Sequence, residues 1–168
     1  MVKLFSKSIL EHLMMLNKII TWLLFYSCTL VASSNAFVWD INSTWYKTLV
    51  TPAFSPPSWL FGPVWTILYL LIATSAYRFV FMKDTNLKSI LLGLWALQIC
   101  LNTIWVSIYF GANDLFSALV VISILWVCIV FIIMLSWSVD RVSSFLLLPY
   151  FLWVSFASIL NVSYWYLN

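Results

Sequence analysis

Five stretches of the chain carry no charged side chain, and each is long enough to cross a lipid bilayer as a helix. They are residues 19–39, 48–77, 89–113, 115–139 and 142–168. A hydrocarbon core of about 30 Å needs about 20 apolar residues in a helix, whereas a membrane strand alternates apolar and polar residues. With 64% hydrophobic and 8% charged residues, the chain also lacks the polar surface of a soluble domain. The sequence therefore predicts an all-α integral membrane protein, a bundle of five transmembrane helices.

The joints between these stretches are too short to hold a soluble domain. We therefore expect a single five-helix domain over residues 19–168, preceded by a cytoplasmic extension over residues 1–18. If the chain crosses five times, seven of its eight Lys and Arg residues fall on one side and only Lys47 on the other. The positive-inside rule then places the N-terminus in the cytoplasm and the C-terminus outside it.

The first stretch has a second interpretation. Lys3 to Lys18 also suit the basic start of a signal peptide, with Ser34 to Ala36 as its cleavage site. The apolar run continues past Ala36 to Trp39, which favours an uncleaved membrane span. The extension itself is compatible with a short helix on the membrane surface or with a disordered tail.

Residue types exclude several kinds of chemistry. The single histidine, His12, lies outside every stretch, and no acidic residue lies inside one. A Ser/His/Asp triad, a zinc site or a pair of catalytic carboxylates therefore cannot be assembled in the membrane. Cys28, Cys100 and Cys128 lie in three different stretches and lack CxxC spacing, which is typical of small buried side chains. We expect no metal, no obligatory cofactor, no conventional catalytic residue and no nucleic-acid partner.

Three stretches place aromatic and uncharged polar side chains along one helical face, at spacings of three or four residues. The faces are Trp65, Tyr69 and Ala73; Trp95, Gln98, Asn102 and Trp105; and Tyr150, Trp153, Ala157, Asn161 and Tyr164. In one interpretation the amides join helices by hydrogen bonds and the indoles fill space. In the other, the faces line a cavity for a large planar apolar ligand. The spacing alone leaves both open.

Four prolines precede the apolar part of the second stretch, in "PAFSPPSWLFGPVWTILY". Ser55 followed by two prolines suits a helix start, because proline in a first turn loses no hydrogen bond. Pro63 predicts either a kink or a later start of the helix. The preceding segment, with Trp45, Tyr46 and Phe54, is then an irregular cap over the outer end of the bundle. A lid is one use of such a cap.

The segment "WYKTLVTPAFSPPSWLFGPVWTILY" resembles the signature of the TspO/translocator protein family. Two later segments, "LQICLNTIWVSIYFGAN" and "LLLPYFLWVSFASILNVSYWYLN", are similar to that family's third and fifth helices. The resemblance implies a five-helix bundle, commonly a homodimer, with a ligand cavity beneath the first external loop. It implies binding of porphyrins such as protoporphyrin IX and haem, of sterols, and of synthetic benzodiazepine-site drugs. Some bacterial members are described as degrading porphyrin in light.

The family's ligand site transfers to positions that largely coincide with the three faces. The resemblance implies a ligand-binding site formed by Trp59, Trp65, Tyr69, Gln98, Asn102, Trp105, Trp153, Ala157 and Asn161. If porphyrin is degraded, the resemblance and the redox capacity of indole point to Trp59, Trp65 and Trp153. The expected function is binding of tetrapyrroles in sensing, sequestration or transport. The alternatives are light-dependent porphyrin degradation, sterol or lipid binding, and a structural protein without a ligand.

Two departures from the family pattern weaken parts of this expectation. No Lys or Arg follows Tyr164 or Tyr166, so the family's sterol-recognition motif lacks its basic residue. Thr51 stands where bacterial members often carry lysine, which removes a charge that would contact porphyrin propionates.

Overall fold

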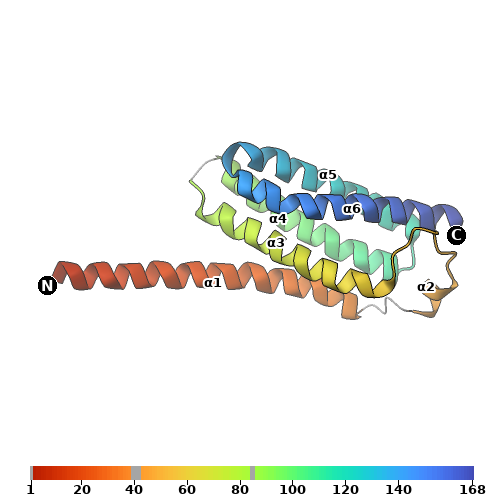
Figure 1. Cartoon of the computed structure of the whole chain (residues 1–168), viewed down its shortest axis with the longest axis horizontal. Helices are drawn as coiled ribbons and strands as arrows, with labels where there is room; N and C mark the ends of the chain where they lie inside the picture. Colours follow the sequence, from red (N-terminus) through yellow and green to blue (C-terminus); the bar gives the residue numbers. More distant parts are fainter. Residues whose placement is uncertain (1, 39–42, 84–85) are drawn as a thin grey trace.

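The computed structural model describes residues 2–38, 43–83 and 86–168, with the side chains of the first helix described over residues 13–31. All regular elements in these ranges are helical (Figure 1). They are α1 (Val2–Val38), α2 (Thr44–Thr48), a 3-10 turn (Ser58–Leu60), α3 (Phe61–Phe81), α4 (Asn86–Val106), a π-helical turn (Ser107–Gly111), α5 (Leu115–Val139) and α6 (Arg141–Leu167). Five segments are long and apolar enough to span a membrane: Leu13–Val31, Ser58–Phe81, Asn86–Gly111, Leu115–Val139 and Arg141–Leu167. The predicted all-α membrane fold with five spans is confirmed.

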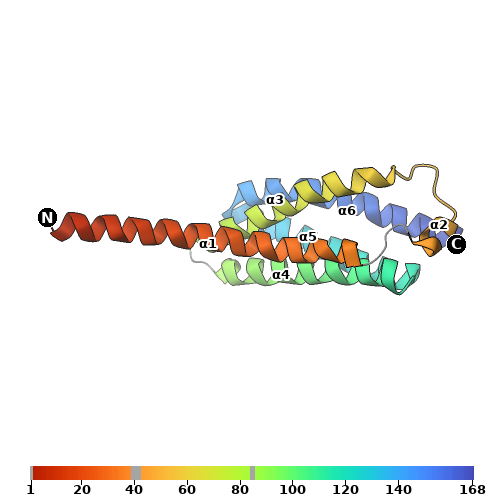
Figure 2. The same cartoon turned by 90° about the horizontal axis from the view of Figure 1, so that it is seen from below.

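The five long helices form a closed ring in the spatial order α1, α3, α6, α5, α4. Figure 2 shows α1 lying along the side between α3 and α4, which completes the ring. Side chains such as Ile72 and Ile129 are fully buried between the helices. Others, such as Phe131 and Leu152, are more than half exposed on the outside. A helix that is apolar all round suits a bundle with lipid outside and protein inside.

The two ends of the bundle differ. At one end lies the cap, which we define as residues 43–60, together with the C-terminal end of α6 (Figure 1). At the other end, which we call the base, α3 ends and the chain turns at Asp140 from α5 into α6. The predicted ligand site therefore belongs to the cap end, and the basic joints near Arg78 and Arg141 belong to the base.

The backbone of α1 is one continuous helix, so residues 2–18 extend the first span without a break. Phe25 packs edge-on against Trp95 of α4, with ring centroids 4.9 Å apart, which sets the level of α1 in the bundle. At about 1.5 Å per residue, Leu13 lies about 18 Å from this contact toward the base. The helix projects beyond the base (Figure 1), and the division of the chain at residue 19 stays a prediction. The alternative cleavage site at residues 34–36 lies on helical backbone whose side chains are outside the described ones.

The prolines separate the cap from α3. Pro57 precedes the 3-10 turn, and α3 begins at Phe61. Pro63 therefore lies in the first turn of α3, where a missing N–H group costs no hydrogen bond. The later of the two predicted helix starts is thus correct. Ser55 does not cap the helix, because Pro57 is the N-cap residue of the 3-10 turn and Leu60 that of α3, and the Ser55 hydroxyl lies 3.4 Å from that of Tyr164.

Candidate ligand-binding site

The cap is held to the end of α6 by polar contacts to Tyr164 and to Asn168. The hydroxyls of Tyr46 and Tyr164 share a hydrogen bond of 3.0 Å. The side-chain amide of Asn168 accepts a hydrogen bond from Val50 N–H at 2.8 Å and donates to Val50 C=O at 3.3 Å. Burial, followed by the bond with Tyr164, raises the pKa of Tyr46 above its ordinary value, so Tyr46 remains a neutral phenol. The contacts that close this end are therefore uncharged.

Aromatic rings add a second set of contacts beneath the cap. Tyr46 lies 5.7 Å from both Phe110 and Tyr164, measured between ring centroids. Phe54 packs edge-on against Phe156 of α6 at 6.3 Å. Tilted and edge-to-face pairs at these distances each contribute about 0.5–1.5 kcal/mol beyond the apolar area that they bury. The predicted aromatic cap is therefore present and is packed onto the bundle.

A cavity of about 110 Å³ lies between the cap and the helix ends. It is lined by Tyr46, Ser58, Phe61, Trp65, Trp105, Val106, Tyr109, Phe110, Ala157, Leu160, Asn161 and Tyr164. Seven of these twelve side chains are aromatic and none is charged. The lining therefore offers flat π surfaces, with hydroxyl groups and one amide as its polar atoms.

The π-helical turn after α4 supplies one wall of the cavity. Its wider geometry shows in the bond from Ala112 N–H to the carbonyl of Ser107, five residues back, at 3.0 Å. Such a turn rotates the residues within it relative to a regular helix. Phe110 consequently lines the same cavity as Trp105 and Tyr109, whose rings are 5.3 Å apart.

Asn161 joins three helices at the cavity wall. Its Oδ1 accepts a hydrogen bond from Trp105 Nε1 at 3.1 Å, and its Nδ2 donates to the Leu115 carbonyl at 3.0 Å. The Trp105 indole is thereby held with its ring along the cavity. Ala157, one helical turn earlier on α6, leaves open space where a larger side chain would project.

The remaining polar residues of the predicted stripe lie deeper in the bundle, in a buried network. Tyr69 donates to Asn102 Oδ1 at 3.0 Å, and Tyr150 donates to Gln98 Oε1 at 2.9 Å. Asn102 Nδ2 lies 3.5 Å from the Tyr150 hydroxyl and links the two pairs. Tyr69, Gln98 and Asn102 thus join α3, α4 and α6 and do not line the cavity. The stripes thus line a cavity near the cap, and their amides join helices deeper in the bundle.

Gln98 keeps one polar group without a partner. Its Nε2 is buried and makes no hydrogen bond to any described residue. A buried donor in this state costs about 1–3 kcal/mol unless water or a ligand meets it. The network is therefore incomplete at this amide.

Trp59 and Trp153 lie outside the cavity. Trp59, in the 3-10 turn, is 71% exposed. Trp153 packs edge-on against Phe61 at 5.7 Å and beside Phe156, and its buried Nε1 has no partner among the described residues. Of the nine predicted site residues, the cavity thus brings together Trp65, Trp105, Ala157 and Asn161.

Several lining residues are absent from the predicted site. Tyr109 continues the spacing of the α4 stripe four residues after Trp105, so the periodicity contained a signal for it. Tyr164 was on the predicted α6 face and Tyr46 in the predicted cap. Phe110 carried no periodic signal, because only the π-helical turn brings it to the cavity.

No group of three or more His, Cys, Asp or Glu side chains able to hold a metal occurs among the described residues. The cavity itself is lined by aromatic rings and uncharged polar groups. Tyr46, Ser58, Tyr109 and Tyr164 supply its hydroxyls, and Tyr46 and Ser58 belong to the cap.

Sequence comparisons identify relatives along most of the chain. The sequence model of the TspO/MBR family matches residues 20–167. Protein CrtK of Rhodobacter capsulatus is 37% identical over 145 residues, which cover 86% of this chain and 89% of that protein. The tryptophan-rich protein TspO of Chlorobaculum tepidum is 39% identical over 127 residues, which cover 75% of this chain and 80% of that protein. The translocator protein of Homo sapiens is 32% identical over 133 residues, which cover 77% of this chain and 78% of that protein.

Proposed function

The chain belongs to the TspO/MBR family of membrane proteins, and on that premise we propose that it binds tetrapyrroles such as protoporphyrin IX or haem beneath the cap. The observation that carries the proposal is the aromatic, uncharged cavity at the cap end. A tetrapyrrole is a large flat π system, and it gains most from rings such as Trp65 and Trp105 that offer their faces. Hydroxyls at the cap side suit its polar substituents.

The volume of the cavity adds a condition. At about 110 Å³ it is smaller than the roughly 300–1,000 Å³ typical of ligand sites, so a macrocycle enters only when the cap moves outward. The polar contacts that resist this movement are few, and each contributes about 0.5–1.5 kcal/mol. Binding therefore couples to the position of the cap. Such coupling supports a role in sensing, sequestration or passive exchange of the ligand, in keeping with relatives named sensory and translocator proteins.

Titration of the purified protein with protoporphyrin IX, followed by tryptophan fluorescence, tests the proposal. We expect saturable quenching, and at least tenfold weaker binding in Ala157→Phe, because the new ring occupies the cavity. Ile159→Phe is the matched control, since this residue lies on the same helix but is 60% exposed toward lipid. Quenching that does not saturate, or that is unchanged in Ala157→Phe, would contradict the proposal.

The photochemical alternative has less support. It assigns the chemistry to Trp59, Trp65 and Trp153, of which only Trp65 lines the cavity. A sterol or another lipid is the alternative occupant, and competition with protoporphyrin IX in the same titration distinguishes it.

We also propose that the protein forms a homodimer through α4. Gly93, Ala96 and Cys100 are exposed on the outer face of this helix, and nothing lies within 4 Å of a Cβ placed on Gly93. Small side chains on a lipid-facing surface allow two helices to approach closely. Oxidative crosslinking through Cys100 in membranes tests the dimer, with Cys100→Ser as the control. A monomeric band in both proteins would argue against it.

A further inference from the structure

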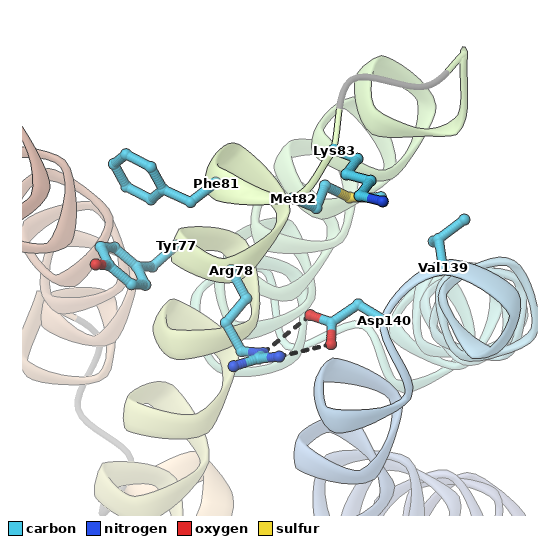
Figure 3. Close-up of a pocket in the computed structure, with 7 residues that line it drawn as sticks. All are labelled: Tyr77, Arg78, Phe81, Met82, Lys83, Val139 and Asp140. Atoms are coloured by element: carbon cyan, nitrogen blue, oxygen red, sulfur yellow. Dashed lines mark hydrogen bonds and ion pairs between the residues drawn. The ribbon is translucent and has the colours of Figure 1, made fainter.

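A second hollow lies at the base, at the far end of the bundle from the cap. It is a groove of about 600 Å³ between the end of α3 and the turn from α5 to α6. Figure 3 shows its lining residues, which are Tyr77, Arg78, Phe81, Met82, Lys83, Val139 and Asp140. The groove is thus more than five times larger than the cavity beneath the cap. It is also open to its surroundings, and it combines apolar walls with charged groups.

The charged groups in the groove form an asymmetric ion pair. Arg78 donates to Asp140 through Nε at 2.9 Å and through Nη2 at 2.7 Å (Figure 3). Asp140 also accepts a hydrogen bond from the Ser143 hydroxyl at 2.6 Å. The Asp140 side chain is 10% exposed, whereas that of Arg78 is 38% exposed. A molecule that enters the groove therefore meets the cation, while the carboxylate is already satisfied.

Part of the arginine remains available for a ligand. The two hydrogen bonds to Asp140 use Nε and Nη2, so Nη1 of Arg78 makes no hydrogen bond to any described residue. Guanidinium is planar and presents its donors in a fixed fork that matches phosphate as well as carboxylate geometry. The ion pair with Asp140 holds Arg78 in one orientation, so its free edge is positioned in advance.

Lys83 adds a second cation at the rim of the groove. It follows the end of α3 and lies across the groove from Val139 in Figure 3. It is exposed and forms no ion pair within the described part of the chain. With two cations and one carboxylate, the lining carries a net charge of +1. The electrostatic complement of the groove is therefore an anion.

The apolar part of the lining indicates what kind of anion fits. Tyr77, Phe81 and Met82 lie beside the charges, and Phe81 is 40% exposed. The groove is at the end of the membrane-spanning segments Ser58–Phe81 and Leu115–Val139, where lipid headgroups meet water. A soluble anion gains nothing from the apolar walls, whereas a phospholipid places its phosphate by the cations and its glycerol and upper acyl chains along the rings.

We propose that this groove binds the phosphate group of an anionic phospholipid, with Arg78 and Lys83 as its cationic ligands. The expected lipid charge agrees with the predicted topology, which places the base at the cytoplasmic, anionic leaflet. The site is independent of the cavity beneath the cap, because the two hollows lie at opposite ends of the bundle and share no lining residue.

Native mass spectrometry of the detergent-purified protein tests the proposal, with phosphatidylglycerol and phosphatidylcholine as probes. We expect the first phosphatidylglycerol to bind at least fivefold more tightly than the first phosphatidylcholine. Lys83→Gln should lower that preference about threefold to fivefold, because one surface cation is lost. The ion pair of Arg78 is untouched in this variant, so the fold is retained.

Lys88→Gln is the matched control, since Lys88 lies in the first turn of α4 at the same end but does not line the groove. It should leave the preference within twofold of the original protein. Equal binding of the two lipids by the original protein would overturn the proposal. So would equal losses in the two variants, which indicate only a general surface field. Displacement of the lipid by a tenfold excess of inorganic phosphate would also overturn it, because the site would then recognise a free anion.

Discussion

The cap end and the base of the bundle are closed by different forces. At the cap end, neutral phenols, one amide and tilted or edge-to-face rings enclose a cavity of about 110 Å³. At the base, the ion pair between Arg78 and Asp140 joins α3 to the α5–α6 turn beside an open groove of about 600 Å³. Neutral hydrogen bonds contribute little each and break singly, whereas a partly buried ion pair is costly to break. We therefore expect the cap end to open and the base to stay fixed.

This difference agrees with how each end is built from the chain. The base is formed by the ends of long helices that run directly into one another, as α5 does into α6 at Asp140. The cap is a separate segment whose only regular helix, α2, has five residues. A helix of this length is unstable on its own. Its position is therefore set by its contacts with α6, and loss of those contacts frees it.

The largest expected effect comes from breaking the base. Arg78→Ala leaves the Asp140 carboxylate, 10% exposed, without its cation. A fully buried carboxylate that loses its partner costs about 3–5 kcal/mol, and because this groove admits water we expect a loss of about 2–3 kcal/mol in unfolding free energy. Unfolding by denaturing detergent in mixed micelles measures it.

Arg141→Ala provides the control for this prediction. Arg141 is exposed, adjoins Asp140 in the chain, and makes no ion pair among the described residues. Its removal should change stability by less than about 0.5 kcal/mol. If both substitutions have the same small effect, the ion pair does not fix the base, and the contrast between the two ends fails.

A smaller effect is expected from releasing the cap. Asn168→Ala removes the amide that bonds both backbone groups of Val50. One lost contact of this kind costs about 1 kcal/mol, so the Val50 amide should exchange its hydrogen about fivefold faster. Hydrogen exchange with mass spectrometry, on peptides that cover the cap, measures this rate.

Ser163→Ala is the matched control for the cap, because the Ser163 hydroxyl bonds only within α6, to the carbonyl of Ile159. It should leave exchange in the cap unchanged. Unaltered exchange of Val50 in Asn168→Ala would show that the Asn168 amide does not hold the cap. The cap would then depend on the Tyr164 hydroxyl contacts and on ring packing.

The sequence was sufficient for the fold because membrane spans follow from charge-free length. Prediction from the sequence fails where tertiary contacts determine the position of a helix in the bundle. The level of α1 in the bundle depends on the contact of Phe25 with Trp95, which a charge pattern does not predict. A long lysine side chain reaches the interface from within a helix end, so a charge is an imprecise boundary marker. Arg78 likewise lies inside the last turn of α3.

The candidate site was only partly predictable for the same reason. Spacing identifies the face of a helix but not the depth at which it lies in the bundle. Trp105 and Asn161 face the cavity, whereas Gln98 and Asn102 use the same kind of face to join helices farther from the cap. Phe110 depends on a π-helical turn, which has no simple sequence signature.

The stability of each end should depend on pH in its own way. This effect is the smallest near neutral pH, and it tests the contrast between the two ends most sharply. At the base, burial raises the pKa of Asp140, but hydrogen bonds from Arg78 and Ser143 and the Arg78 charge outweigh it, so the pKa lies below its ordinary value. A carboxylate with a depressed folded pKa stabilises the fold above its unfolded pKa, about 4, and this contribution is lost as the pH falls further.

The cap responds in the opposite direction. Because burial and Tyr164 raise the pKa of Tyr46, its contribution is complete below the unfolded value of about 10 and is lost as the pH rises through the folded value. Acid should therefore loosen the base and alkali the cap, as followed by hydrogen exchange of each end. Tyr46→Phe should abolish only the rise in hydrogen exchange of the cap at alkaline pH. Asp140→Asn should abolish only the part of the acid-induced rise at the base that comes from the ion pair. If either substitution alters both phases, the two ends unfold as one unit, and cap opening cannot proceed without loss of the base.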